Sequence, residues 1–287
     1  MNIEKYTNEL ELNRDGILYS PINSRVSFPD EGNENCFEVE DTSFWFKHRN
    51  NCIIAAIKNH PPALNEEIFD VGGGNGFVSR GIQESGFPVV LVEPGKNGAK
   101  NAKKRGIKNI ICSTLQDAKF KKSSLSAVGA FDVVEHIEND VEFLREINQI
   151  LVPSGKLYIT VPAYQFLWSF DDEFGGHHRR YTISNFTHKL CDSGFEVEFA
   201  TYFFRFLPLP ILLLKTIPHK FGIKSMVTPE KVQNDHSLSN SFVQKIIQKF
   251  LRREISNIEN EKRMSFGGSC LIVARKKTDM SIVTQSN

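Results

Sequence analysis

The sequence predicts an α/β protein whose mostly parallel sheet is doubly wound, with helices on both faces. Short apolar runs of strand length alternate with stretches of helical periodicity, and glycine or proline ends most of these stretches. A glycine-rich turn follows the first apolar run directly. Strands that alternate with helices form right-handed βαβ units, and such units place their strands parallel.

The alternation can be followed element by element along the chain. A first helix is expected from about Thr42, because Phe46, Ile53 and Ile57 lie near helical spacing before Pro61 ends it. Strands are then predicted at 68–71, 89–92, 109–112, 127–132, 156–161, 195–200 and 265–274, and helices at 77–85, 97–105, from 140, 182–193 and from 241.

These elements divide the chain into five predicted parts. An N-terminal segment with a capping helix precedes a core that contains the alternating elements, and an apolar and helical insertion follows the core. A final strand then returns to the core before a polar tail, which we expect to be disordered. The predicted parts are 1–60, 61–205, 206–262, 263–276 and 277–287.

Composition narrows the classes of function. The 287 residues carry a formal net charge of +1, so no strong overall field favours nucleic acid, and we expect no nucleic-acid partner. The five cysteines are widely spaced and the N-terminus lacks a secretory pattern, so we expect a reduced, cytoplasmic protein. The most apolar window, Phe206 to Leu214, is too short to span a membrane, which needs about 20 residues. Peripheral membrane contact and the oligomeric state stay open.

The glycine-rich turn has the spacing DxGxGxG, formed by Asp70, Gly72, Gly74 and Gly76 between a strand and a helix. Glycines in such a turn permit positive φ and close approach of a ligand, and a helix N-terminus favours an anionic group. The dinucleotide pattern GxGxxG does not fit. Glu93 ends the next strand, where a carboxylate can accept hydrogen bonds from ribose hydroxyls.

The glycine-rich turn, Glu93 and two later segments together resemble the motifs of class I S-adenosylmethionine (SAM) dependent methyltransferases. One contains Thr114-Leu115, and the other runs from Phe131 through Asp132 to Glu135-His136. The resemblance covers about 44–207 and implies a Rossmann-like, seven-stranded sheet. The later loop Gly176-His-His-Arg-Arg-Tyr181 is similar to a bacterial methyltransferase subgroup often associated with cell-surface glycan genes.

The resemblance implies roles for residues on the cofactor side. Thr114 stands where the family often has an aspartate that holds the adenine amino group, while Leu115 would pack on adenine. Arg49, on the helix before the first strand, could meet the SAM carboxylate. The residues predicted to bind the cofactor are Asp70, Gly72, Gly74, Gly76, Glu93, Thr114, Leu115, Phe131 and Asp132.

We expect the 206–262 part to build the acceptor side, and five further residues are candidates for the same side. His136 or His177 could act as a base, since the pKa of an imidazole lies near neutrality, and arginines could grip an anionic acceptor. The alternative is a structural latch in which an arginine pairs with Asp171 or Asp172 and the aromatic residues belong to the core. The predicted catalytic residues are His136, His177, Arg179, Arg180 and Tyr181.

A metal site is a less favoured interpretation. Asp132, Glu135 and His136 lie close in sequence, and His177 could complete a set of ligands for a divalent ion. A Glu-His pair more often caps a helix and lines a pocket, so we assign no metal ligand from the sequence.

The sequence thus predicts a SAM-dependent methyltransferase that acts on an oxygen of a small-molecule, glycan or lipid-linked acceptor. A non-catalytic SAM-binding protein and, less favoured, an NAD-linked oxidoreductase are the alternatives.

Overall fold

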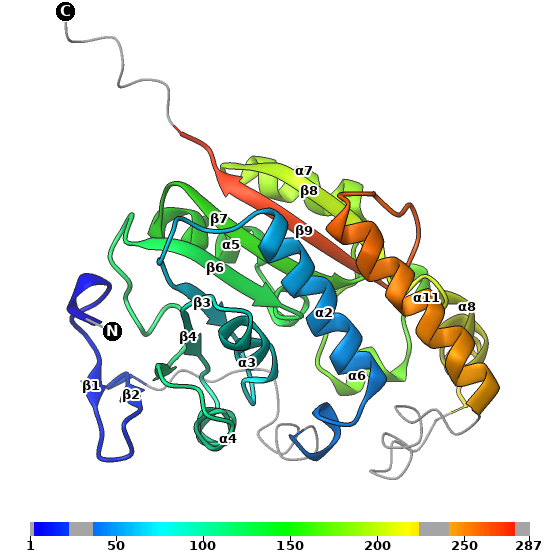
Figure 1. The fold of residues 1–287 in the computed structure, drawn as a ribbon, viewed down its shortest axis with the longest axis horizontal. Coiled ribbons are helices and arrows are strands. Elements are labelled where there is room, and N and C mark those ends of the chain that lie inside the picture. Colours follow the sequence, from blue (N-terminus) through cyan, green and yellow to red (C-terminus); the bar gives the residue numbers. More distant parts are fainter. Residues whose placement is uncertain (1–2, 23–36, 224–240, 279–287) are drawn as a thin grey trace, which may run out of the picture.

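The computed structural model describes residues 3–22, 37–223 and 241–278. These ranges contain one sheet in the order β1-β2-β5-β4-β3-β6-β7-β9-β8 (Figure 1). Its strands are β1 (Glu11–Leu12), β2 (Leu18–Tyr19), β3 (Ile68–Val71), β4 (Val89–Val92), β5 (Ile110–Cys112), β6 (Leu125–Phe131), β7 (Leu151–Pro162), β8 (Phe195–Phe203) and β9 (Ser269–Lys276).

The centre of the sheet is parallel, as the alternating sequence predicts. β3 pairs in parallel with β4 on one side and with β6 on the other. β5 pairs in parallel with β4, and β7 pairs in parallel with β6. Every residue of β3, β4 and β6 is buried, which explains why these strands read as continuous apolar runs. β9 returns antiparallel between β7 and β8, so the last predicted strand closes the core.

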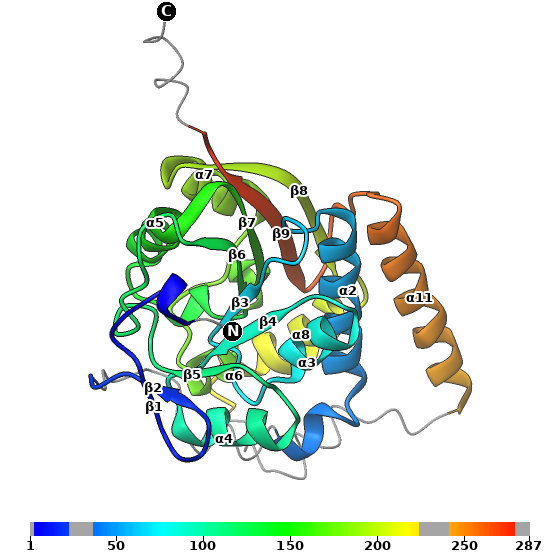
Figure 2. The ribbon, with the colours of Figure 1, turned by 60° about the vertical axis from the view of Figure 1, so that its left-hand side comes forward.

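Helices cover both faces of the sheet. α2 (Phe44–Asn59), α3 (Phe77–Glu84) and α11 (Ser241–Glu259) share one core cluster, whereas α5 (Asp140–Ile150) and α7 (Ile183–Asp192) pack into another. Figure 2 shows α5 and α7 on the side of the sheet opposite α2 and α11. α4 (Lys96–Lys104) packs through Ala99 and Ala102 in a third, smaller cluster.

The described sheet has two strands more than the expected seven. β1 and β2 form an antiparallel pair, and β2 adds to the edge of β5, so part of the polar N-terminal segment extends the sheet. β7 also starts earlier than predicted, at Leu151, because the Pro153-Ser154-Gly155 segment belongs to the strand and Ser154 has a φ of 63°. Residues 279–287 of the predicted tail lie outside the described residues.

The region after β8 is helical, as expected for the insertion. α8 (Pro208–Ile211), the π-helical turn η4 (Leu212–Thr216) and α9 (Ile217–Lys220) follow one another, and α11 runs beside α2 (Figures 1 and 2). None of the helices in the described ranges has the length and apolar content needed to cross a membrane.

One buried carboxylate anchors α11 to the rest of the domain. The Glu254 side chain accepts hydrogen bonds from the backbone N–H groups of Phe204 (2.9 Å) and Arg205 (2.7 Å) and lies 2.8 Å from Nε2 of His48 on α2. Both Glu254 and His48 are buried. α11, α2 and the chain after β8 therefore meet at one carboxylate. Loss of this carboxylate would leave its hydrogen-bond donors without an acceptor.

We predict that Glu254→Ala lowers the free energy of unfolding by about 3–5 kcal/mol, because it removes the acceptor of the buried Phe204 N–H and of the partly buried Arg205 N–H and the carboxylate partner of the buried His48. Urea unfolding followed by circular dichroism measures this change. Glu259→Ala removes an exposed carboxylate from the same helix and should cost less than about 0.5 kcal/mol. Equal losses in the two variants would show that Glu254 is not an anchor.

Candidate active site

A cavity of about 1100 Å³ opens at the carboxyl ends of the parallel strands. In open α/β sheets this edge is where ligands bind, because the loops after the strands meet there. The cavity is lined by the loops after β3, β4, β5 and β6, by the start of α2, and by residues of the 162–180 and 207–215 segments. The structure thus brings together the segments on which the sequence placed the cofactor and the acceptor.

The glycine-rich loop forms one wall of the cavity. Gly72 and Gly74 line it with φ values of 69° and 54°, a conformation that favours glycine. Gly76 is not among the lining residues. It caps the N-terminus of α3 with a φ of 77°, and a Cβ atom there would come within 2.9 Å of Ala102. The third glycine of the motif therefore permits close packing of α3 against α4.

Asp70 lies beneath the loop rather than in the cavity. It is buried at the end of β3, and its carboxylate accepts a 2.6 Å hydrogen bond from Oγ of Ser79. Burial raises the pKa of Asp70 to about 6. A Cβ atom on Gly73 would approach this carboxylate to 2.9 Å, so Asp70 packs directly under the loop.

Glu93 does face the cavity, at the end of β4. Its Oε2 accepts a hydrogen bond from the N–H of Gly74 (2.8 Å), and its Oε1 accepts one from the N–H of Gly95 (2.7 Å). Each carboxylate oxygen can accept more than one hydrogen bond. Glu93 therefore ties together the loops after β3 and β4 at the wall of the cavity.

The remaining residues predicted on the cofactor side also line the cavity: Thr114, Leu115, Phe131 and Asp132. The hydroxyl of Thr114 accepts a hydrogen bond from the N–H of Asp117 (3.0 Å) and so shapes its own loop.

Arg49 donates to Asp132 at 2.6 Å and stacks over the ring of Trp45. Its Nε is buried and has no hydrogen-bond partner among the described residues, although Arg49 borders the cavity.

His136 and His177 meet at the far side of the cavity. Their ring centroids are 4.7 Å apart in an edge-to-face arrangement. Nδ1 of His177 lies 2.9 Å from Oδ1 of Asp172, which is buried. Burial and then the neighbouring His177 lower the pKa of His136 to about 4, so this imidazole is neutral near pH 7. The structure therefore brings the two histidines together in the wall of the cavity.

The arginines of the same loop point in different directions. Arg180 borders the cavity and donates to Asp172 at 2.7 Å. Arg179 pairs instead with Asp140 at 2.9 Å, and the buried hydroxyl of Tyr181 donates to Asp140 at the same distance. Neither Arg179 nor Tyr181 lines the cavity. The Arg180–Asp172 pair is thus the one that the structural latch predicted, whereas Arg179 and Tyr181 contact Asp140, a partner that the latch did not include.

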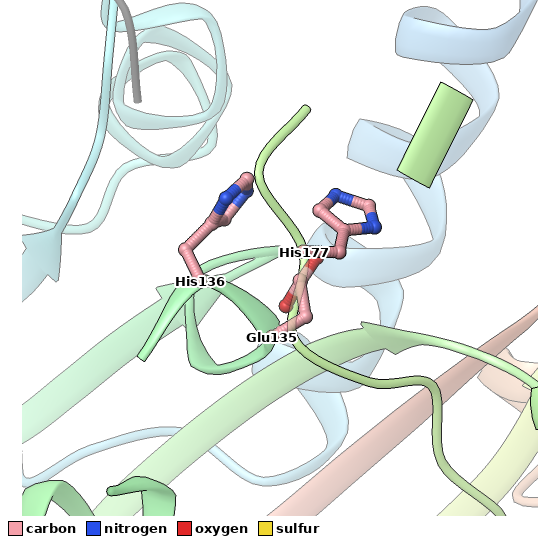
Figure 3. A group of neighbouring side chains, drawn as sticks. All are labelled: Glu135, His136 and His177. Atoms are coloured by element: carbon pink, nitrogen blue, oxygen red, sulfur yellow. The ribbon is translucent and has the colours of Figure 1, made fainter. Parts of the chain in front are cut away.

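Glu135, absent from the predicted catalytic residues, lies beside the two imidazole rings (Figure 3). It is 1% exposed and lines the cavity. Burial and then the nearby Asp132 raise the pKa of Glu135 well above its usual value. The sequence pointed to Glu135 only through its neighbour His136, because the Glu-His pair after the fourth predicted strand raised the hypothesis of a metal site.

Sequence reasoning missed another part of the cavity wall. Glu40 borders the cavity and forms an ion pair with Arg105 at the end of α4, and Asp41 lies 2.9 Å from the same guanidinium. This segment has no periodicity that would signal its role. The segment after β8, by contrast, belongs to the 206–262 part that the sequence analysis expected on the acceptor side, and its Pro210, Ile211 and Leu214 line the cavity as an apolar wall.

Comparison with known proteins agrees with this geometry. The model of a family described as a methyltransferase domain matches residues 46–199, more than half of the chain. Ubiquinone biosynthesis O-methyltransferases are similar to part of the chain. The human mitochondrial protein is 29% identical over 120 residues, which are 38% of this chain and 32% of the human protein. The protein from Rickettsia typhi is 29% identical over 143 residues, 44% of this chain and 58% of its own length.

The chain thus matches well under two thirds of the length of these relatives.

Solved structures resemble the fold of this chain. Phosphoethanolamine N-methyltransferase 2 of Haemonchus contortus, in complex with S-adenosyl-L-methionine, superimposes with a TM-score of 0.55 at 16% identity, covering 88% of this chain and 59% of that one. The YcgJ protein of Bacillus subtilis superimposes with a TM-score of 0.51 at 12% identity, covering 79% and 98%. The matched family model and the Rossmann-like sheet show that this chain belongs to the class I SAM-dependent methyltransferase family.

Proposed function

We propose that this protein transfers the methyl group of SAM to an oxygen of a small-molecule, glycan or lipid-linked acceptor. The observation that carries the proposal is the single cavity that joins the glycine-rich loop and Glu93 to His136 and His177. Ligand pockets commonly measure about 300–1000 Å³, so a cavity of about 1100 Å³ has room for a cofactor and an acceptor together.

The cofactor side of the cavity fits SAM. Gly72 and Gly73 present backbone without side chains, and the buried Nε of Arg49 is a donor suited to a carboxylate. We assign Glu93, which lines the cavity, to the ribose hydroxyls and Leu115 to the base. When bound, SAM supplies an electrophilic methyl group on a sulfonium. The chain's own residues orient the acceptor against it, and orientation provides much of the acceleration in such displacements.

The acceptor side combines polar and apolar groups. We assign activation of the acceptor oxygen to the His136–His177 pair, with Arg180 holding Asp172 in place behind His177. Ile211 and Leu214 give this side an apolar wall, which favours an acceptor with an apolar portion. The relatives named as O-methyltransferases support oxygen as the methylated atom.

This proposal gives each part of the chain a role. Residues 61–205 would hold the cofactor, with the helix of the 1–60 part covering it. Residues 206–262 would form the acceptor side, and 263–276 complete the sheet.

Calorimetric titration with SAM tests the cofactor assignment. We expect micromolar binding by the wild-type protein, at least tenfold weaker binding by Glu93→Ala, and no binding of NAD. Glu84→Ala removes an exposed carboxylate from α3 and should bind SAM like the wild type. Circular dichroism checks that each variant is folded. A folded wild-type protein that ignores SAM would refute the proposal, and binding of NAD alone would favour an oxidoreductase.

Transfer of labelled methyl from SAM tests the catalytic assignment. A panel of phenols, soluble sugars and lipid-linked sugars would be incubated with the protein and the label followed into each class. His136→Ala should lower turnover by about 10²-fold or more while the Kd for SAM changes less than threefold, because the ring acts on the acceptor. Unchanged turnover on the accepted substrate would remove His136 from the mechanism. SAM binding without transfer to any class would favour a non-catalytic role.

The buried acid beneath the loop predicts an effect of pH on stability. The pKa of Asp70 is about 6 in the folded protein, against 3.8 ordinarily, so the native state binds the proton more tightly than the unfolded chain. The stability contribution of this group therefore falls as pH rises from about 4 to about 6, by about 3 kcal/mol.

Asp70→Asn should remove this fall, so that the variant gains stability relative to the wild type between pH 4.5 and pH 7. Urea unfolding at the two pH values measures the difference. Asp192→Asn, at an exposed position at the end of α7, should leave the pH dependence unchanged. A parallel pH dependence in wild type and Asp70→Asn would show that Asp70 is charged at both pH values.

A further inference from the structure

We propose that the helical segment after β8 docks this protein on the surface of an anionic lipid bilayer. The segment runs through α8, η4 and α9, and large apolar side chains on its outer side are exposed. Proteins rarely expose such side chains together unless they meet a partner there. Four of them are spaced by four residues and are called the apolar stripe: Leu209, Leu213, Ile217 and Phe221, which are 63%, 52%, 37% and 79% exposed.

The geometry of the helical segment places the four side chains of the apolar stripe in one row. Residues four apart drift around an α-helix by about 40° at each step, because one turn takes about 3.6 residues. The π-helical turn at 212–216 takes more residues per turn and so counteracts the drift. Leu213 lies within this turn, between Leu209 and Ile217 along the row. The apolar stripe is therefore one continuous surface.

The inner side of the same segment is fixed to the rest of the domain. The buried hydroxyl of Thr216 donates a hydrogen bond to the carbonyl oxygen of Leu167 at 2.9 Å. Lys215 pairs with Asp171 of α6 (Phe170–Phe174) at 2.7 Å. Turning the apolar stripe inward would break both contacts, so its exposure is a property of the fold.

The charge of this region favours a bilayer over another apolar partner. Residues 205–223 and 241–253 contain no aspartate or glutamate, although the whole chain has a formal net charge of only +1. Exposed apolar side chains among cations bind anionic bilayers, whereas interfaces between proteins are depleted in lysine. Besides Lys215, six cationic residues lie in these two ranges, and all six are exposed: Arg205, Lys220, Lys245, Lys249, Arg252 and Arg253.

The first half of α11 extends the surface. Leu251 and Glu254 are buried on the inner side of α11, whereas Ile246 and Phe250 are exposed on its other side. Leu207, just before α8, packs in the same core cluster as Leu251, and Figure 1 shows α8 and the start of α11 at the same end of the molecule. Two helical elements therefore present apolar and basic side chains at one end of the protein.

Docking through this surface would bring the cavity to the bilayer. Leu214 follows Leu213 of the apolar stripe, is itself exposed, and lines the cavity with Pro210 and Ile211. The apolar wall of the cavity is thus continuous with the apolar stripe. An acceptor anchored in the bilayer would then enter the cavity along this wall. That consequence rests on the proposed function, whereas binding to a bilayer does not.

Sedimentation of the full chain with lipid vesicles tests the apolar stripe. We expect the wild type to bind phosphatidylcholine vesicles that contain about 30% phosphatidylglycerol, and to bind pure phosphatidylcholine at least tenfold more weakly. Leu213→Glu should weaken binding to the anionic vesicles at least tenfold, because it places a charge among the side chains that enter the bilayer. Leu64→Glu changes an exposed leucine before β3 and should bind like the wild type.

A second pair of variants tests the contribution of charge. Lys249→Glu on α11 should weaken binding to the anionic vesicles at least fivefold, and added salt should weaken binding of the wild type, because cations near an anionic surface attract it through a screened field. Lys100→Glu makes the same change of charge at an exposed position on α4 and should have no effect on vesicle binding.

Three results would overturn the proposal: no vesicle binding by the wild type, equal binding by the wild type and Leu213→Glu, or equal binding to neutral and anionic vesicles. Sedimentation equilibrium without lipid separates a second occupant. A wild-type dimer that Leu213→Glu makes monomeric, together with no vesicle binding, would assign the apolar stripe to a second copy of the chain.

SAM titration without vesicles keeps this proposal apart from the proposed function. Leu213 lies outside the cavity lining, so Leu213→Glu should bind SAM with the Kd of the wild type. Vesicle binding by a protein that does not bind SAM would support the docking surface and refute the proposed function alone.

Discussion

The contact on which the cofactor side depends is the pair of hydrogen bonds that Glu93 accepts from Gly74 and Gly95. Parallel pairing places Val71 opposite Val92, so the loops after β3 and β4 leave the sheet at the same level. Nothing in that pairing fixes the loops relative to each other. The carboxylate does so, and Glu93 also lines the cavity. One side chain therefore fixes the two loops and forms part of the cavity wall.

Asp172 has the corresponding position on the proposed acceptor side. It accepts from the backbone N–H of Ser169, from Arg180 and from His177, so one buried carboxylate sets the start of α6 and the direction of two side chains of the following loop. The cost of burying this charge is offset by the number of donors around it. Substitution of Arg180 would thus disturb His177 without any contact between arginine and acceptor.

The sequence predicted the central fold well because buried parallel strands are short apolar runs with clear ends. β3 and β4 have the expected bounds, and Glu93 faces the cavity as the position of its strand end implied. The direction of side chains in irregular segments was harder to predict from the sequence. Arg179 and Tyr181 both contact Asp140, while Arg180 between them faces the cavity. This is the alternation of an extended chain. Adjacent arginines look equivalent in a sequence until the backbone conformation is known.

Asp132 connects the proposed cofactor and acceptor sides of the cavity. Its backbone conformation would suit glycine, but its side chain is needed. Its φ of 56° lies in the left-handed region and turns the chain from β6 into the short helix η2 (Val134–His136), which carries Glu135 and His136. This conformation costs about 1 kcal/mol for a residue with a Cβ atom. A glycine would avoid the cost but would lose the carboxylate, which accepts from Arg49 at 2.6 Å and from Thr160 at 3.0 Å. These two hydrogen bonds offset the strain. They also link α2, which borders the cofactor side, to the turn that presents the acceptor-side residues, so the two sides keep a fixed relative position.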